Sequence, residues 1–384
     1  MRLKLRHIGP IVEAELAFGD LTVLVGPQAS GKSIALQMLK LMVDTGRVQD
    51  EMGRHGLDWS RKLPEFLDAY LGEGMRGIWT TGKSEVWWRS QKVDMDKVAG
   101  QLKKTKRETM FFIPAQRVLA LRNGWPRPFS DYSPGDPFAV REYSEQLRQL
   151  VERELSGAGD LFPQPRRLKQ EFRDLLASQI FGDFHLRVDK LGPQKRLVLG
   201  ANGGALPYMV WSAGQREFVP LLLGMYWLMV ATKTPRRGDI EWVVIEELEM
   251  GLHPRAIAVV LLMVLELLWR GYRVCLSTHS PQVLEAVWAL RHLQDAQASP
   301  AEVLDVFQAP NKPPMQKVAS AALKKTLKVF YFDRESGTSR DISRLDPDDE
   351  QAGKSGWGGL IEFSGRANDA VARAATKAEW EGHS

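Results

Sequence analysis

A glycine-flanked loop near the start of the chain strongly limits what this sequence can fold into. The apolar run Leu21–Val25 breaks at Gly26 and leads to Gly31-Lys32-Ser33, which fits the phosphate-binding P-loop pattern G-x-x-x-x-G-K-[ST]. In such a loop, backbone N–H groups and the next helix N-terminus face the anion, the lysine reaches the outer phosphates and the hydroxyl serves Mg²⁺. The predicted nucleotide-binding residues are Gly26, Pro27, Gln28, Ala29, Ser30, Gly31, Lys32, Ser33 and Ile34.

The elements around this loop come in the order that a P-loop requires. Leu21–Val25 is a continuous apolar run rich in branched residues, as expected for a strand buried on both faces of a parallel sheet. Apolar residues after the loop predict a helix that stops near Gly46. Residues 2–18 predict two alternating strands with a turn at Gly9-Pro10. The expected fold class is therefore α/β.

Composition excludes some classes of protein. With 384 residues and 44% hydrophobic content, the chain can form two or three domains around a substantial core. A single cysteine, Cys275, rules out a disulfide framework within the chain and favours a cytoplasmic location. The apolar segments 218–232 and 257–269 are too short for membrane spans, so we expect core helices and no membrane association. The net charge of +5 is compatible with nucleic acid without demonstrating it.

The middle of the chain gives a weaker signal. We expect helices over 139–155 and 164–180, a hairpin over 184–199, and a further strand over 206–211. Asn123–Phe138 is rich in proline, glycine and aromatic residues and is interpreted as a long surface loop. Heptads are not sustained, so a short helical insertion is expected instead of a long coiled coil. The basic run Lys103, Lys104, Lys106 and Arg107 is either a solvated face or a contact to nucleic acid.

Two acidic residues follow a second predicted buried strand. The apolar run Trp242–Ile245 ends in Glu246 and Glu247. Carboxylates at the carboxyl end of a parallel strand lie where open α/β sheets bind ligands. Glu246 could hold Mg²⁺ through its water shell, and Glu247 could orient and deprotonate an attacking water.

Two further segments could contribute to the same site. Ser212-Ala213-Gly214-Gln215 opens the predicted helix 218–232 and so offers backbone N–H groups to an anion. His279 follows the predicted strand 273–277 at the same sheet edge, where it could hydrogen-bond a γ-phosphate. Taken alone, the tetrapeptide would be an ordinary helix cap, and a lone histidine is usually structural.

Together and in this order, these segments resemble the ABC-type ATPase heads of the SMC and RecF group and of the OLD-like ATPases. The resemblance implies an SMC-head-like mixed sheet flanked by helices, with ATP and Mg²⁺ as cofactors. It makes Gly26–Ser33 the Walker A loop, 212–215 the signature motif, 245–247 Walker B, and 251–254 the D-loop. It also implies catalytic roles for Lys32, Glu247 and the switch His279, and metal contacts from Ser33, Glu246 and the Q-loop residue Gln116.

The sequence departs from this group at three positions. Glu246 replaces the usual Asp, Gln28 the common Asn of the P-loop, and Leu248 the common Pro. The longer Glu246 side chain could slow turnover. The resemblance further implies a head-to-tail homodimer, or higher homo-oligomer, in which Ser212 and Gly214 of one subunit close on ATP held by Lys32 of the other.

The expected organisation has four segments. Residues 1–45 carry the P-loop, 46–205 form the insertion with the Q-loop region, and 206–290 carry the remaining motifs. Residues 291–384 would complete the head with a hairpin over 328–342 and an amphipathic helix over 361–375. The acidic run 346–350 follows no apolar strand, so it is interpreted as a solvated loop and not as part of a Toprim nuclease.

These features predict a soluble Mg²⁺-dependent ATPase whose ATP-gated dimerisation is its output. The first hypothesis is a defence-type ATPase that senses nucleic acid or protein, in anti-phage defence, and controls a separately encoded effector. The second is a RecF-like repair clamp on double-stranded DNA, for which binding should fall steeply with salt. The third is an ATP-dependent scaffold that hydrolyses too slowly to count as a catalyst.

Overall fold

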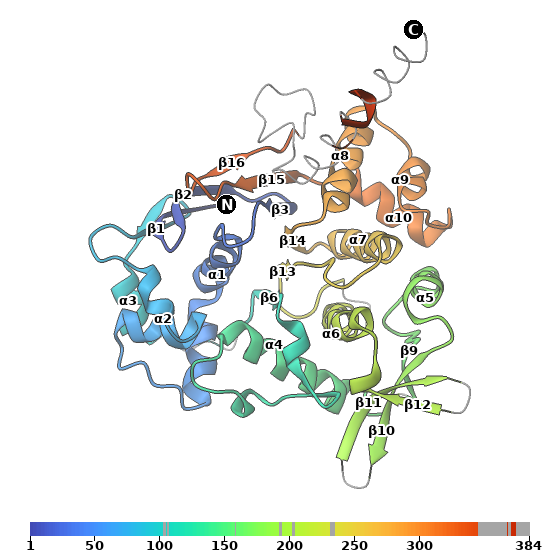
Figure 1. The fold of residues 1–384 in the computed structure, drawn as a ribbon, viewed down its shortest axis with the longest axis horizontal. Coiled ribbons are helices and arrows are strands. Elements are labelled where there is room, and N and C mark those ends of the chain that lie inside the picture. Colours follow the sequence, from blue (N-terminus) through green and yellow to red (C-terminus); the bar gives the residue numbers. More distant parts are fainter. Residues whose placement is uncertain are drawn as a thin grey trace.

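A six-stranded sheet lies at the centre of the computed structural model (Figure 1). The structure describes residues 1–344 except 103–104, 106, 158, 192–193, 202–203 and 231–234, and also 367 and 370–373. In spatial order, the strands are β16 (Ser339–Asp341), β15 (Leu327–Phe332), β3 (Leu21–Val25), β14 (Arg273–Thr278), β13 (Trp242–Glu246) and β6 (Met110–Ile113). All are parallel except β16, which pairs antiparallel with β15. The predicted α/β fold with a mixed sheet is confirmed.

The central strands are buried on both faces, which explains their continuous apolar runs. Every residue of β3, β6 and β13 is buried. Successive residues point to opposite faces, so Val23 packs into one hydrophobic cluster and Leu24 into the other. The register places Glu246 beside Ser277, and Thr278 beside Val25. The ends of β3, β13 and β14 therefore lie level at one edge of the sheet.

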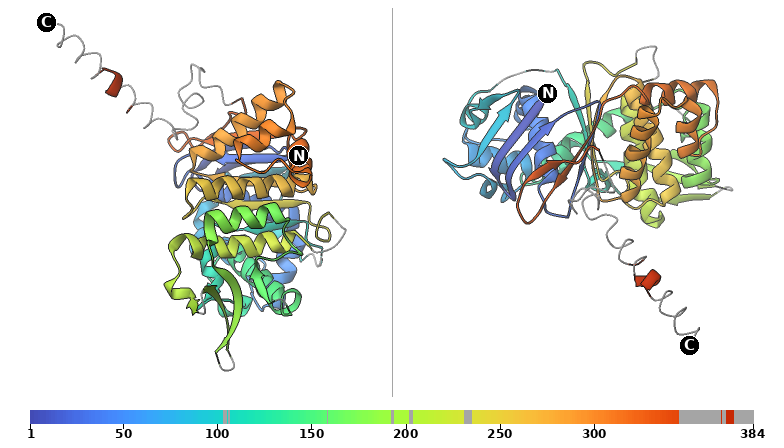
Figure 2. Two further views of the ribbon diagram at one scale, coloured as in Figure 1. Left: turned by 90° about the vertical axis from the view of Figure 1, so that its right-hand side faces the viewer. Right: turned by 90° about the horizontal axis from the view of Figure 1, so that it is seen from above.

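Different elements cover the two faces of this sheet (Figure 2). One cluster contains the P-loop helix α1 (Lys32–Arg54), α2 (Leu63–Leu71) and α3 (Met95–Gly100). It also includes a second sheet with the order β2 (Ile11–Ala17), β1 (Arg2–Ile8), β4 (Glu85–Trp88) and β5 (Gln91–Val93). The predicted turn between β1 and β2 at Gly9-Pro10 is confirmed. The other cluster contains α4 (Phe138–Gln149), α5 (Gln170–Leu176), α6 (Ala213–Leu228), α7 (Pro254–Trp269), α8 (Pro281–Asp295), α9 (Pro300–Val306) and α10 (Pro313–Ala322).

The sequence predicts that helix α1 stops near Gly46. In the structure it continues to Arg54, with a kink at Asp44 (φ −122°, ψ 28°). The Asp44 carboxylate accepts hydrogen bonds from the backbone N–H groups of Thr109 (3.0 Å) and Met110 (2.9 Å). It also pairs with the buried Lys40 ammonium at 3.0 Å. These partners stabilise the bend, and the helix resumes beyond it. The structure therefore has a kink where the sequence predicts the end of the helix.

The segment 123–138 is only in part the surface loop that its composition predicts. It begins with the turn between β7 (Leu121–Arg122) and β8 (Trp125–Pro126), and its Phe129 and Phe138 are buried. Phe129 stacks on His55 of the α1 C-cap with ring centroids 4.1 Å apart. The aromatic residues thus anchor the segment to the core, which the proline and glycine content does not reveal.

The predicted hairpin over 184–199 is confirmed as β10 (His185–Leu191) and β11 (Gln194–Ala201). They form a four-stranded sheet with β9 (Asp160–Phe162) and β12 (Gly204–Pro207). The strand expected over 206–211 is wrong beyond Pro207, because residues 208–210 form a 3₁₀ turn. The helix expected over 164–180 begins only at Gln170, where α5 starts.

The hairpin expected over 328–342 is confirmed as β15 and β16. Lys103, Lys104 and Lys106, the run 346–350 and most of 361–375 lie outside the described residues. Both apolar segments form core helices, α6 and α7, although α6 spans 213–228. Within the described ranges, no helix has the length and apolar character needed to span a membrane.

Candidate nucleotide site

The P-loop has the backbone conformation and the packing that its glycines require. Gly26 and Gly31 have φ angles of 147° and 97°. A Cβ at Gly26 would lie 2.3 Å from the Phe332 carbonyl oxygen of β15, and one at Gly31 would lie 2.5 Å from Ile11 Cγ1. Helix α1 then begins at Lys32 without a capping side chain. The loop therefore presents a helix N-terminus suited to anions.

The Lys32 side chain folds back over the loop. Its ammonium donates to the carbonyl oxygens of Gly26 (2.8 Å) and Pro27 (2.7 Å). Burial lowers the pKa of Lys32 to about 8, although the carboxylates of Glu247 and Glu249 raise it in part. Around the lysine, Pro27, Gln28, Ala29 and Ser33 are exposed, and Ile34 is half-buried. A phosphate could therefore reach the loop from solvent.

Glu246 has the environment of a metal-binding carboxylate. It is only 2% exposed, and burial raises its pKa, while the Ser33 hydroxyl and the Ala115 N–H lower it. Oε2 accepts from Ala115 N at 3.2 Å, whereas Oε1 has no hydrogen-bond partner among the described residues. Such an orphaned oxygen beside a serine hydroxyl fits a hard cation. The described ranges hold no group of three or more His, Cys, Asp or Glu residues suited to a metal, so phosphates would supply further ligands, as is usual for Mg²⁺.

Glu247 is held in a strained backbone conformation. Its φ of +45° lies in the left-handed region, which non-glycine residues rarely adopt and which is concentrated at functional sites. Its N–H donates to the Ser277 carbonyl oxygen at 2.9 Å. Its carboxylate Oε1 lies 3.6 Å from His279 Nε2. Burial and the Lys32 charge lower the pKa of His279, so the neutral imidazole is favoured at pH 7.

Residues 127–285 match the family described as "AAA domain, putative AbiEii toxin, Type IV TA system". This span contains 212–215, Glu246, Glu247 and His279, and the P-loop precedes it. The chain has the fold of a P-loop ATPase, and residues 127–285 resemble this AAA family. The resemblance stated from the motif order is thereby confirmed at that level.

Three solved SMC heads are similar to the chain, each aligning with 88% of it. One, bound to the C-winged helix domain of ScpA, has 10% identity, 95% of its own length covered and a TM-score of 0.42. The head domain from Thermotoga maritima has 11% identity, 97% covered and a TM-score of 0.33. A head with an extended coiled coil bound to the C-terminal domain of ScpA, derived from Pyrococcus furiosus, has 10% identity, 94% covered and a TM-score of 0.35. Among curated proteins, no significant match is found.

In this P-loop fold, the predicted Q-loop residue is not joined to the site. Gln116 is exposed, and in the part of the chain that the structure describes its side chain makes no hydrogen bond to Glu246. The neighbouring Arg117 is fully buried instead. Its guanidinium donates to the carbonyl oxygens of Glu246 (3.0 Å), Glu247 (3.0 Å) and Glu217 (3.2 Å). Arg117 thus links Glu246 and Glu247 to helix α6.

Sequence reasoning also missed Glu249. Its Oε1 accepts from the Thr278 hydroxyl (2.9 Å) and from the His279 N–H (2.7 Å). These contacts hold the end of β14 and the His279 backbone next to the Walker B loop. The available signals were an arginine directly after Gln116 and a third acid two positions beyond Glu247.

The predicted signature motif, residues 212–215, forms a capping box at the start of α6. Ser212 Oγ accepts from Gln215 N (3.2 Å), and Gln215 Oε1 accepts from Ser212 N (3.0 Å). Ser212 and Ala213 are exposed. A Cβ at Gly214 would lie 2.8 Å from the Gly251 carbonyl oxygen, so the motif packs against its own D-loop. Among the described residues, no hydrogen bond or ion pair joins 212–215 to the P-loop of the same chain.

Proposed function

We propose that the chain is a Mg²⁺-dependent ATP hydrolase. The observation that carries this proposal is that the P-loop after β3 and the acids at the end of β13 lie at the same edge of the sheet, where the charges of Glu246 and Glu247 act on Lys32. Lys32 and the start of α1 would hold the phosphates, and Glu247 would take a proton from the attacking water. His279 would hydrogen-bond the γ-phosphate. Ser33 and Glu246 would hold Mg²⁺, which supplies neutralisation of phosphate charge when bound.

The output of this ATPase is proposed to be ATP-linked dimerisation. Ser212 and Ala213 are exposed at the N-terminus of α6 and could therefore close on a nucleotide held by Lys32 of a second copy. The dimer would control a separately encoded effector in anti-phage defence. Support for that role comes from the toxin–antitoxin description of the family that residues 127–285 match.

The test of hydrolysis is the steady-state ATPase rate of the purified chain and of Glu247→Gln, with and without linear duplex DNA. The variant should retain ATP binding and lose about a hundredfold or more in turnover, because the general base is removed. It should also accumulate as an ATP-bound dimer in size-exclusion chromatography. An unchanged rate in Glu247→Gln would remove this residue from the mechanism. Strong stimulation of the wild type by duplex DNA would favour a RecF-like clamp.

The shared site is tested separately with Ser212→Arg. The added side chain lies at an exposed helix cap, so folding and nucleotide binding should be retained while dimerisation is blocked. Hydrolysis should fall with the loss of the dimer, as measured by light scattering and phosphate release. If the variant hydrolyses ATP at the wild-type rate, the shared-site arrangement is wrong.

A further inference from the structure

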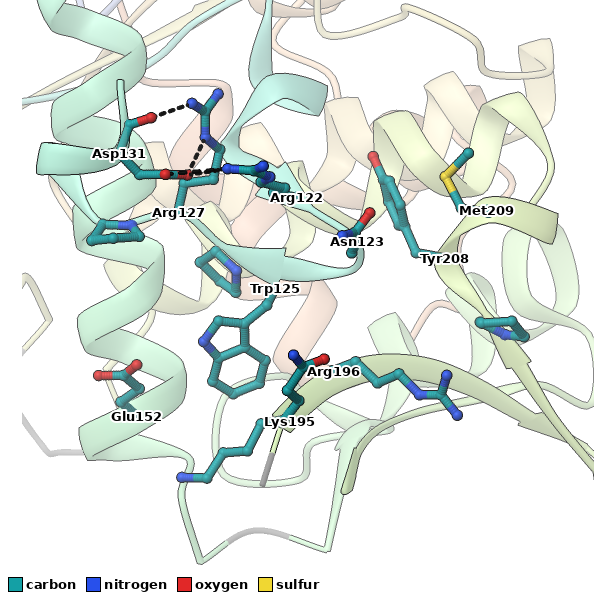
Figure 3. Close-up of a pocket in the computed structure, with 14 residues that line it drawn as sticks. Arg122, Asn123, Trp125, Arg127, Asp131, Glu152, Lys195, Arg196, Tyr208 and Met209 are labelled. Carbon is teal, nitrogen blue, oxygen red and sulfur yellow. Dashed lines mark hydrogen bonds and ion pairs between the residues drawn. The ribbon is translucent and has the colours of Figure 1, made fainter. Parts of the chain in front are cut away.

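A pocket of about 740 Å³ lies outside the nucleotide site, between the β7–β8 hairpin, β11 and the turn at 208–210 (Figure 3). Its lining includes Arg122, Trp125, Lys195, Tyr208 and Met209. Pockets of about 300–1,000 Å³ accommodate ligands of the size of one or two nucleotides. No part of the function proposed above uses this pocket.

The pocket has an excess of positive charge. Arg122 and Arg127 share a single carboxylate, that of Asp131, at 3.2 and 3.0 Å. Lys195 is exposed, and within the described ranges it forms no ion pair. Glu152, which also lines the pocket, is paired with Arg148. Arg196, a fourth cation of the lining, pairs with Asp189. The remaining three cations, Arg122, Arg127 and Lys195, have only the Asp131 carboxylate to balance them, so an anionic ligand is favoured.

The pocket also has an apolar wall with a flat ring. Trp125 is half-buried, and its indole points into the pocket between Glu152 and Lys195 (Figure 3). Met209 is 69% exposed at the rim. Aromatic rings beside basic side chains bind single-stranded nucleic acid, because bases stack on the ring while cations attract the phosphates. The bases of an intact duplex are stacked inside the helix and could not reach Trp125.

We propose that this pocket binds one or two unpaired nucleotides of a single strand, with a base stacked on Trp125 and phosphates near Lys195 and Arg122. One wall of the pocket, at Tyr208, is close in the chain to the predicted signature motif at 212–215. Tyr208 packs edge-on against Trp211 with centroids 5.2 Å apart, and Ser212 follows at once. Occupancy of the pocket would therefore bias the position of the signature motif, a consequence that rests on the proposed ATPase function.

Binding is tested without ATP, by the fluorescence anisotropy of labelled oligomers of about ten nucleotides with the full chain. Trp125→Leu should weaken binding about tenfold or more, and Trp125→Phe, which keeps a ring, should retain most of it. Lys195→Gln should lower the slope of log affinity against log salt by about 0.7. The matched control is Lys97→Gln, an exposed lysine on α3 outside the pocket, which should change neither quantity.

Several results would overturn the proposal: no binding at low salt, equal binding by Trp125→Leu and the wild type, or equally tight binding of a blunt duplex. Capture of an acidic peptide in place of the oligomer would also overturn it. A comparison of DNA and RNA oligomers, with free mononucleotides as competitors, shows which of these three ligands the pocket prefers. Oligomer binding by a chain that hydrolyses no ATP would support the pocket and refute only the ATPase proposal.

Discussion

Arg117→Met is a strong test of how the Walker B residues are held in place. The substitution keeps a long side chain but removes three hydrogen bonds to the carbonyl oxygens of Glu217, Glu246 and Glu247, together with an ion pair to the Glu217 carboxylate at 3.7 Å. Hydrogen bonds to a charged group contribute about 1.5–3 kcal/mol each, or about 4.5–9 kcal/mol for three. Relief of the desolvated guanidinium charge offsets part of this, so the free energy of unfolding should fall by about 3–5 kcal/mol.

The effect on turnover should exceed what lost stability explains. Without the guanidinium, the left-handed backbone at Glu247 loses one of three hydrogen bonds, and those from its N–H to Ser277 and from the Met250 N–H to its carbonyl oxygen remain. Misplacement of a reacting group by about 1 Å can cost a factor of about 100 in rate. We therefore expect kcat to fall about ten- to a hundredfold. The affinity for ATP should stay nearly unchanged, because Arg117 makes no contact with the P-loop in the part of the chain described.

The matched control is Arg141→Met. Arg141 is also a buried arginine that donates to backbone carbonyl oxygens, in this case those of Asp136 and Ser133. Urea unfolding should show a comparable loss of stability in both variants, and only Arg117→Met should lose turnover at a temperature where both are folded. Arg117→Lys retains the charge without the planar fork and should be intermediate. A wild-type kcat in Arg117→Met would refute the positioning role.

Two further predictions concern the P-loop. Gly26→Ala places a Cβ 2.3 Å from the Phe332 carbonyl oxygen, at a residue with a φ of +147°. The variant should therefore unfold at a lower temperature and lose binding of a fluorescent ATP analogue. Normal binding would contradict this prediction. Because burial lowers the pKa of Lys32 to about 8, the ammonium loses its proton as the pH rises through that value, and ATP affinity should fall there. Isothermal titration across that pH range measures the change, and a flat profile would show that the Lys32 charge does not contribute to binding.

The sequence predicts those parts of the fold that depend on local pattern. A buried parallel strand needs a continuous apolar run, and a P-loop needs glycines at set positions. The sequence alone therefore predicts β3, β13 and the loop after Val25. The kink at Asp44 is different, because its hydrogen bonds come from Thr109 and Met110 in a distant segment. Without knowledge of those two partners, the glycine and polar residues near Gly46 predict the end of the helix.

Composition misled for the same reason in 123–138. Proline and glycine there indicate turns correctly, and the structure does contain a tight hairpin at Asn123-Gly124. Composition does not show which parts of the chain pack against this segment. The Gly124 carbonyl oxygen accepts from Leu197 N at 2.8 Å, and Phe129 stacks on His55. Whether such a segment is exposed depends on residues tens of positions away in the chain.

At the nucleotide site, sequence motifs name the side chains that would face a ligand and miss those that face the protein backbone. Lys32, Glu246 and Glu247 belong to recurrent patterns because phosphate and metal chemistry dictates their type and spacing. Arg117 hydrogen-bonds to three carbonyl oxygens, which every residue possesses, and its ion pair with Glu217 Oε2 at 3.7 Å joins segments 100 positions apart, so its partners form no recurrent pattern in the sequence. The carbonyl oxygens of Glu246 and Glu247 must nevertheless be satisfied, because Glu246 is buried and Glu247 has a strained backbone. A cation with several donors in a rigid plane meets that need, which is why we expect arginine, and not lysine, to be required there.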